Sequence, residues 1–350
     1  MKPGDFPDSG ALTVNSLGGT RTLSLPLKSM RLPICILTCL VAATPLCAQP
    51  APERPKILGV AHMAIYVKDL AKTRQFYEDF LGYGEPFTLP KKTGGGVRIA
   101  FAKINDRQYI EIFNEEDRGE GQLNHISFYT DDADRMYAYL KSKGIAVMGD
   151  KGSVGKGQTG NKNFNVKDPD GHIVEIVEYQ PDSWTAKNAG KFEPATRISN
   201  HVMHVGVLVG DLEKSTQFYG NILGFKEFWR GGGGNGKPLS WVNMKVPDGD
   251  DYLEFMLYST IPEPGGRGTK NHMSLIVPDA QKAVEELQKR AAKGLYDKEI
   301  KIQVGVNKKR QVNLYDPDGT RVELMEPNTI DGQPAPSSDA PAPKATRASR

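Results

Sequence analysis

The sequence predicts an α+β protein in which one strand–helix–strand unit occurs four times. Residues 168–178 (DPDGHIVEIVE) and 316–326 (DPDGTRVELME) carry nearly the same letters. Residues 60–81 and 202–223 each read as an alternating strand, an Asp-Leu pair and a helical segment containing Phe-Tyr. Repeats of this length rarely bury a core alone, so we expect them to pair into two domains.

Each unit begins with an alternating strand that leads into an Asp-started helix, because Asp favours helix N-caps. The four beginnings are residues 60–81 (VAHMAIYVKDLAKTRQFYEDFL), 124–140 (NHISFYTDDADRMYAYL), 202–223 (VMHVGVLVGDLEKSTQFYGNIL) and 271–287 (NHMSLIVPDAQKAVEEL). Further strands follow the helix of each unit. They read VRIAFAKI and RQYIEIFN in the first unit, NFNVKDPDGHIVEIVEY in the second, LSWVNMKV and DYLEFMLY in the third, and QVNLYDPDGTRVELME in the fourth. DPDG is a turn signal, since Pro suits the second turn position and Gly tolerates positive φ.

These repeats place a first domain at residues 56–180 and a second at 198–328, joined by a linker at 181–197. We expect consecutive units to pair, because this linker separates two compact halves. Residues 329–350 are rich in Pro, Ala and Ser and are expected to be a disordered tail.

The segment 30–48 (MRLPICILTCLVAATPLCA) resembles a secretory signal. It has a basic start, an apolar stretch too short to span a bilayer, and a small residue at its end. Residues 1–29 then read as an over-extended start, and we expect an exported protein, periplasmic or secreted. A short membrane anchor, a lipid anchor on Cys47 or a chance apolar run are the alternatives. All three cysteines lie in this segment, so the mature chain would have no thiolate ligand and no disulfide.

The charge pattern argues against nucleic acid as a partner. The formal net charge is +3, the charged residues are mixed along the chain, and no basic block occurs. We expect a small-molecule substrate, no stable membrane span in the mature chain, and a monomer or homodimer.

Histidine and glutamate recur at one place in every unit. The chain has six His, and four of them begin the first strands: His62, His125, His204 and His272. The matching last strands carry Glu111, Glu175, Glu254 and Glu323. The separations are 49, 50, 50 and 51 residues (111 − 62, 175 − 125, 254 − 204 and 323 − 272). A lone strand His is usually a satisfied core residue, but a fourfold match favours ligation of a divalent metal.

Imidazole and carboxylate donors without thiolate suit Zn, Ni, Mn, Co or Fe(II). Four protein ligands on an octahedral ion leave two positions for water or for two substrate oxygens. Such an ion can polarise a carbonyl and stabilise an enediolate. A Glu that loosens from the ion can then move a proton.

Over roughly residues 56–328, the motifs HMAIYVKDL…FYEDFLG, HVGVLVGDL…FYGNILGF and the two DPDG…E strands resemble the βαβββ modules of the vicinal oxygen chelate superfamily. That resemblance implies two cup-shaped, glyoxalase-like domains. It also implies a metal set in each domain. The two sets are His62, Glu111, His125 and Glu175, and His204, Glu254, His272 and Glu323.

The superfamily holds several chemistries, so three functions remain open. The first is a glyoxalase- or epimerase-like lyase or isomerase acting on a small carbonyl or hydroxy-acid substrate, with Glu175 or Glu323 as the base. Beside the first strands we find no basic residue to hold glutathione carboxylates. The second is an Fe(II)-dependent extradiol-type dioxygenase; those enzymes carry a Tyr where Asn165 and Asn313 stand here. The third is a metal-free binding protein of the bleomycin-resistance type. Other chemistries of the superfamily, such as thiol transfer to an epoxide, complete the range.

Overall fold

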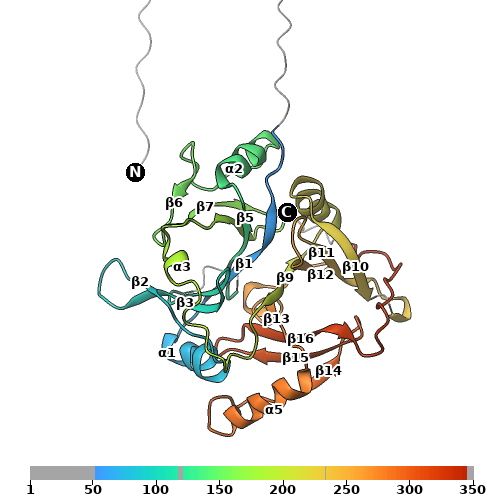
Figure 1. The fold of residues 1–350 in the computed structure, drawn as a ribbon. Coiled ribbons are helices and arrows are strands. Elements are labelled where there is room, and N and C mark those ends of the chain that lie inside the picture. The colour runs from blue at the N-terminus through green and yellow to red at the C-terminus, as the bar shows by residue number, and fades with distance from the viewer. Residues whose placement is uncertain (1–51, 117–120, 233, 345–350) are drawn as a thin grey trace, which may run out of the picture. The chain divides into compact units, whose positions relative to one another are not determined.

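The computed structural model describes residues 52–116, 121–232 and 234–344. Within them the chain forms two curled sheets of eight strands each (Figure 1). The first sheet has the order β2-β3-β4-β1-β5-β8-β7-β6. Its strands are β1 (Ile57–Tyr66), β2 (Thr88–Pro90), β3 (Val97–Asn105), β4 (Gln108–Phe113), β5 (Leu123–Thr130), β6 (Gly155–Lys156), β7 (Lys162–Lys167) and β8 (Ile173–Glu178).

The second sheet repeats this arrangement with the order β10-β11-β12-β9-β13-β16-β15-β14. Its strands are β9 (Val202–Val209), β10 (Lys226–Gly232), β11 (Leu239–Lys245), β12 (Tyr252–Leu257), β13 (His272–Ile276), β14 (Ile302–Val304), β15 (Lys309–Tyr315) and β16 (Arg321–Thr329). In both sheets the first strands of two consecutive units pair antiparallel, β1 with β5 and β9 with β13. Consecutive units therefore share a sheet, and the predicted fold class is confirmed.

Each unit places one helix after its first strand, and an Asp caps every one of them. The helices are α1 (Leu70–Arg74), α2 (Ala133–Ser142), α4 (Leu212–Ser215) and α5 (Ala280–Ala291). The caps are Asp69, Asp132, Asp211 and Asp279, whose side chains accept backbone N–H groups of the first turn. α1 and α4 continue as the π-helical segments η1 (Gln75–Phe80) and η2 (Thr216–Ile222), which bury their Phe-Tyr pairs. Short helices α3 (Trp184–Lys187), η3 (Gly234–Gly236) and η4 (Pro264–Gly266) lie in connections.

The two DPDG turns join the sheets to one another. The Tyr219 hydroxyl donates to Oδ2 of Asp168 over 3.0 Å, so the turn of the first sheet packs on η2. The Tyr77 hydroxyl donates to Oδ2 of Asp316 over 3.3 Å, so the turn of the second sheet packs on η1. All four side chains are buried. The repeated turn therefore fixes the contact between the two halves as well as leading into the last strand of each half.

The linker and part of the tail make definite contacts in the structure. The ammonium group of Lys103, itself fully buried, donates to the carbonyls of Asn188 and Lys191 in the linker. In the tail, the backbone N–H of Ser338 donates to the carbonyl of Arg230. The carbonyl of Pro341, also in the tail, accepts from the backbone N–H of Leu239. The domain limits stay predictions, and the segments 1–29 and 30–48 lie outside the described residues.

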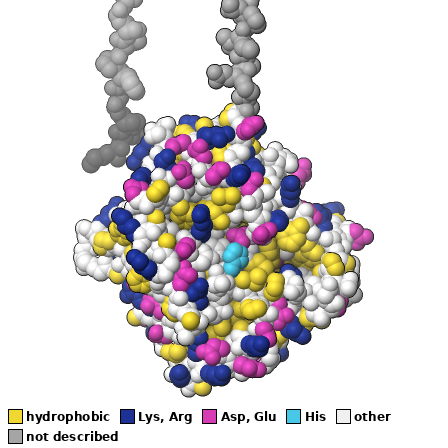
Figure 2. Space-filling view, in the orientation of Figure 1, with side chains coloured by type: hydrophobic (Ala, Val, Ile, Leu, Met, Phe, Trp, Pro, Cys, Tyr) yellow, Lys and Arg dark blue, Asp and Glu magenta, His cyan; other side chains and the backbone are white. Residues whose placement is uncertain are grey.

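The surface and the helices bear on the sequence-based expectations for charge and for membrane spans. Figure 2 shows acidic and basic side chains interspersed on the face drawn, in agreement with the mixed charge of the sequence. Within the described ranges, no helix has both the length and the apolar character needed to cross a bilayer.

Candidate metal centres

The repeated His and Glu residues come from the four central strands of each sheet. In the first sheet the order β4-β1-β5-β8 brings Glu111, His62, His125 and Glu175 side by side. Register places Ala64 between Glu111 and His125, and Ser127 beside both His62 and Glu175. The second sheet repeats these rows, with Gly206 at the position of Ala64. Because alternate residues of a strand share a face, all four functional groups project into one cup.

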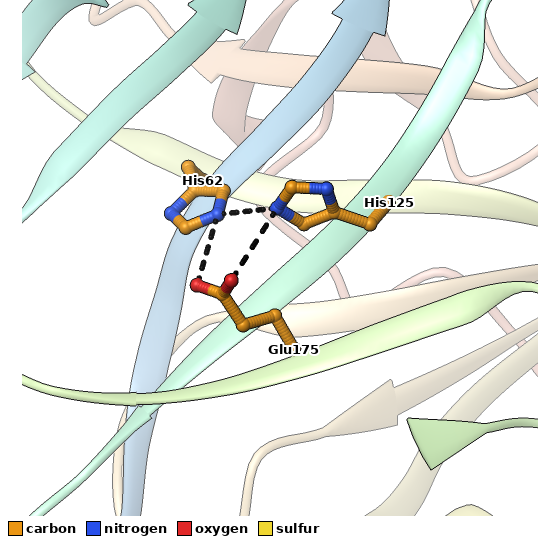
Figure 3. Close-up of side chains that lie close together, drawn as sticks. All are labelled: His62, His125 and Glu175. Carbon is orange, nitrogen blue, oxygen red and sulfur yellow. Dashed lines mark hydrogen bonds and ion pairs between the residues drawn. The ribbon is translucent and has the colours of Figure 1, made fainter. Parts of the chain in front are cut away.

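The first centre is compact. Nε2 of His62 lies 2.8 Å from Nε2 of His125 and 3.4 Å from Glu175 Oε1, and the three side chains point toward one another (Figure 3). Glu111 completes the group, with oxygens 3.6 Å from Nε2 of His62 and 3.8 Å from Nε2 of His125. Ligands about 2.0–2.2 Å from one ion lie roughly 3 Å apart when adjacent, and these separations have that scale.

The second centre has the same form. The Nε2 atoms of His204 and His272 are 3.1 Å apart. A Glu323 oxygen lies 3.5 Å from His204 Nε2, and a Glu254 oxygen lies 3.5 Å from His272 Nε2. The structure thus brings all eight predicted residues together, in the two predicted sets of four. Their role as metal ligands stays a prediction.

Burial sets the electrostatics of both centres. It lowers the pKa of all four histidines, that of His125 to about 3, so the imidazoles are neutral and offer a lone pair. Burial and the neighbouring carboxylate raise the pKa of Glu254 to about 8, and burial raises that of Glu175 to about 7. Paired carboxylates beside neutral imidazoles favour a divalent cation, which would relieve their mutual repulsion.

Hydrogen bonding supports the same conclusion. At each centre two imidazole Nε2 atoms face each other. When both imidazoles are neutral, this contact can pair at most one N–H donor with one nitrogen acceptor. In the second centre, Oε2 of Glu323 is buried without a hydrogen-bond partner among the described residues. Buried polar atoms are rarely left unpaired, so the donor set fits a bound metal ion.

The first centre is closed off by the linker. The Asn161 side-chain amide donates to the buried hydroxyl of Thr185, and the backbone N–H of Trp184 donates to the carbonyl of Thr159. The Trp184 ring packs edge-on against Phe87, with centroids 5.6 Å apart. The cavity left at this centre has a volume of about 40 Å³, which is room for about one water molecule. α3 therefore covers the small cavity at the first centre.

The second centre opens to a larger cavity. It has a volume of about 310 Å³ and includes Glu254 and Glu323 in its wall. The remaining wall is formed by Trp229, Trp241, Gln303, Val304, Gly305, Val306, Asn307, Gln311, Asn313, Arg321 and Met325. An adjoining cavity of about 360 Å³ shares Trp229 and Asn307 with it. Small ligands fit volumes of this order, so the two carboxylates of the second centre border a ligand-sized cavity, while its two histidines are fully buried behind them.

Sequence reasoning missed the residues that distinguish the two cups. From the sequence, Lys156, Arg230 and Lys237 in the Gly-rich loops are expected to be solvated charges or contacts of an anionic substrate. In the structure Lys156 pairs with Asp182 and Arg230 pairs with Glu227. The cation in the cavity wall is Arg321, and its signal in the sequence was that Thr320 and Arg321 of DPDGTR stand where DPDGHI has His172 and Ile173.

Two further histidines lie outside the centres. Because it follows a turn in the sequence, His172 is expected to be exposed, and the structure shows that this prediction is wrong. The side chain is buried with Nδ1 2.9 Å from Asp168, because the DPDG turn lies inside the contact between the sheets. His201 contacts Asp251 over 2.7 Å and belongs to neither centre.

Relatives among characterised proteins are distant. The chain is 24% identical to a lactoylglutathione lyase of Arabidopsis thaliana over 172 residues, which cover 47% of this chain and 54% of the relative. The chain thus spans about half the length of that protein. It is 23% identical to glyoxalase I of Saccharomyces cerevisiae over 335 residues, covering 80% of this chain and 96% of the yeast protein.

Solved structures give the same fold. The 2,3-dioxygenase LapB of Pseudomonas sp. KL28 superposes with a TM-score of 0.56 at 18% identity, covering 81% of this chain and 97% of the dioxygenase. A family model also matches residues 59–176 and 200–324, one match in each sheet. On this evidence the chain belongs to the Glyoxalase/Bleomycin resistance protein/Dioxygenase superfamily.

Proposed function

We propose that this chain is a divalent-metal-dependent lyase or isomerase of the glyoxalase type, with its reaction in the second domain. The substrate would be a small carbonyl or hydroxy-acid compound. The observation that carries the proposal is the cavity at the second centre, whose wall includes two buried carboxylates that each lie 3.5 Å from a neutral imidazole. Relatives with lactoylglutathione lyase and glyoxalase I activity agree with this choice.

His204, Glu254, His272 and Glu323 would hold the ion. A bound divalent ion would polarise the substrate oxygen and so acidify the neighbouring C–H bond. The protein's own contribution is to bind the substrate beside Glu323, to exclude bulk water with Trp229 and Trp241, and to move the proton.

Glu323 is better suited than Glu175 to the role of base. In the first centre, Asn163 donates to Oε2 of Glu175 over 2.7 Å and Ser127 lies 3.4 Å from Oε1, so both oxygens are held. Ser274, the counterpart of Ser127, also lowers the pKa of Glu323 by hydrogen bonding, but no donor matches Asn163, and Oε2 of Glu323 has no close partner among the described residues. Glu323 can therefore take a proton from substrate carbon at one position and return it at another. Glu175, beneath α3, would act mainly as a ligand of a stabilising metal.

The test is exchange of the substrate α-hydrogen. Purified full-length protein, reconstituted in turn with Zn²⁺, Ni²⁺, Mn²⁺, Co²⁺ and Fe²⁺, is incubated in D₂O with 2-hydroxy and 2-oxo compounds. Loss of the α-proton signal is followed by ¹H NMR. We expect metal-dependent exchange that Glu323→Gln reduces by about 10²-fold or more, while Glu175→Gln changes it little.

The dioxygenase is the second candidate, because LapB shares the fold over both domains. Oxygen uptake with catechols, dependent on Fe²⁺ and absent in Glu323→Gln, would replace the isomerase proposal with ring cleavage. If neither proton exchange nor oxygen uptake occurs with any of these metals, the enzyme proposal is wrong and a binding protein remains.

A further inference from the structure

Arg321 is a cation without a close ion pair among the described residues, although its charge acts on the nearby carboxylates of Glu254 and Glu323. It is the first residue of β16, in register with His272 and on the same strand face as Glu323. Within the described part of the chain it forms no salt bridge with a carboxylate, and its buried Nε has no hydrogen-bond partner. Its charged end contacts only neutral groups: Nδ1 of His272 at 2.6 Å, the Lys270 carbonyl at 3.5 Å and the Met256 sulfur at 3.6 Å.

A metal ion at the second centre would release this guanidinium. Nδ1 of His272 lies 2.6 Å from Arg321 Nη2 and 2.8 Å from the Lys270 carbonyl, and it cannot accept from one and donate to the other in the same tautomer. Ligation through Nε2 requires the proton on Nδ1, which then donates to the carbonyl. Arg321 thereby loses its closest acceptor and keeps only the long contacts to the Lys270 carbonyl and the Met256 sulfur, so its guanidinium can donate to a ligand in the cavity.

The two centres differ in the cations that act on their carboxylates. Arg98 acts on Glu111 in the first centre, whereas Arg321 and Lys309 act on Glu323 in the second. The residue matched to Arg321 in the first domain is Ile173, two positions before Glu175 as Arg321 is before Glu323. The cavity wall of the second centre therefore includes a cation, beside Trp229 and Trp241, that the cavity wall of the first centre lacks.

We propose that Arg321 forms an anion subsite and that the substrate is a small 2-hydroxy or 2-oxo carboxylate. Its carboxylate lies on the guanidinium, and its adjacent oxygen points to the His–Glu group. Arg binds a planar carboxylate through paired N–H donors that carry a positive charge. The uncharged side chains in the wall of this cavity do not offer such a pair. This inference rests on the proposed function and narrows its substrate class.

The test compares two ligands that differ only in the charged group. Lactate and propane-1,2-diol share one carbon skeleton, and only lactate carries a carboxylate. Each is titrated by calorimetry into zinc-loaded full-length protein whose metal content has been measured. We expect lactate to bind at least tenfold more tightly than the diol. Arg321→Gln should weaken lactate binding by at least tenfold, and Arg321→Lys, which keeps the charge, should lose less.

Arg310→Gln is the matched control. It makes the same charge change on the neighbouring strand β15, but Arg310 pairs with Glu326 and is not part of the cavity wall. The variant should bind lactate as the unmodified protein does. Equal affinity for lactate and the diol, or unchanged lactate binding in a folded Arg321→Gln protein, would overturn the subsite. Failure of α-hydrogen exchange together with a tenfold preference for lactate would overturn the proposed reaction and leave the subsite standing.

Discussion

Replacing Gly206 by Ala should disable the second metal centre without changing any proposed ligand. A Cβ added at Gly206 would lie 2.0 Å from Cε1 of His272 and 2.4 Å from its Nδ1. Ordinary contact begins at 3.4 Å, so the ring must move by about 1.4 Å (3.4 − 2.0). Displacements of about 1 Å typically cost on the order of 10²-fold in function. We therefore expect metal affinity at this centre to fall about 100-fold, or roughly 2.8 kcal/mol.

The assay is competition for Zn²⁺ with a chromophoric chelator, which reports the two centres as separate classes of affinity. Ala64→Gly is the control, because Ala64 lies between Glu111 and His125 as Gly206 lies between Glu254 and His272. Removing that methyl group should leave both affinities near their original values. Circular dichroism confirms that each variant is folded. A folded Gly206→Ala protein with unchanged affinity at both centres would refute the geometry assigned to His272.

Three further predictions concern the metal-free protein, the contact between the sheets and the linker. Burial raises the folded-state pKa of Glu175 to about 7 and of Glu254 to about 8, whereas the unfolded chain has ordinary values near 4.3. Between about pH 6.5 and 8 the folded state therefore binds more protons than the unfolded chain, and its stability falls as the pH rises. Chelator-treated protein should melt at a lower temperature at pH 8 than at pH 6.5, and added Zn²⁺ should abolish this difference. Tyr219→Phe removes a buried hydrogen bond to Asp168 and should lower the free energy of unfolding by about 2 kcal/mol in a urea titration, with metal content unchanged; an unaltered midpoint would contradict that role of the turn. Trp184→Ala should open the first cup and speed removal of its metal by a chelator, whereas an unchanged rate would show that α3 does not limit access.

The repeat explains why so much of the fold could be predicted. Period-two strands, Asp-capped helices and the DPDG turns are local features, and the structure confirms them as four units. Because the His and Glu residues occupy one position in every unit, pairing the units was enough to assemble the two sets of four. Because the strands repeat with the same register, the His and Glu side chains take the same relative positions in both sheets.

What could not be predicted depends on contacts between units. The burial of His172 arises because the turn of the first sheet packs on Tyr219 of the other half. The closing of the first cup depends on where the linker folds, and nothing local to Trp184 or Thr185 indicates this. Arg321 reads as an ordinary strand residue until the register places it beside His272.

Metal content tests the central claim most directly. Full-length protein is reconstituted with Mn²⁺, Fe²⁺, Ni²⁺ or Zn²⁺, dialysed, and analysed by mass spectrometry beside Glu175→Ala and Glu323→Ala. The account predicts two equivalents in the unmodified protein and the loss of one equivalent in each variant, from the first and the second centre respectively. No bound metal after reconstitution with any of the four ions would contradict the two centres and every catalytic role assigned to their residues.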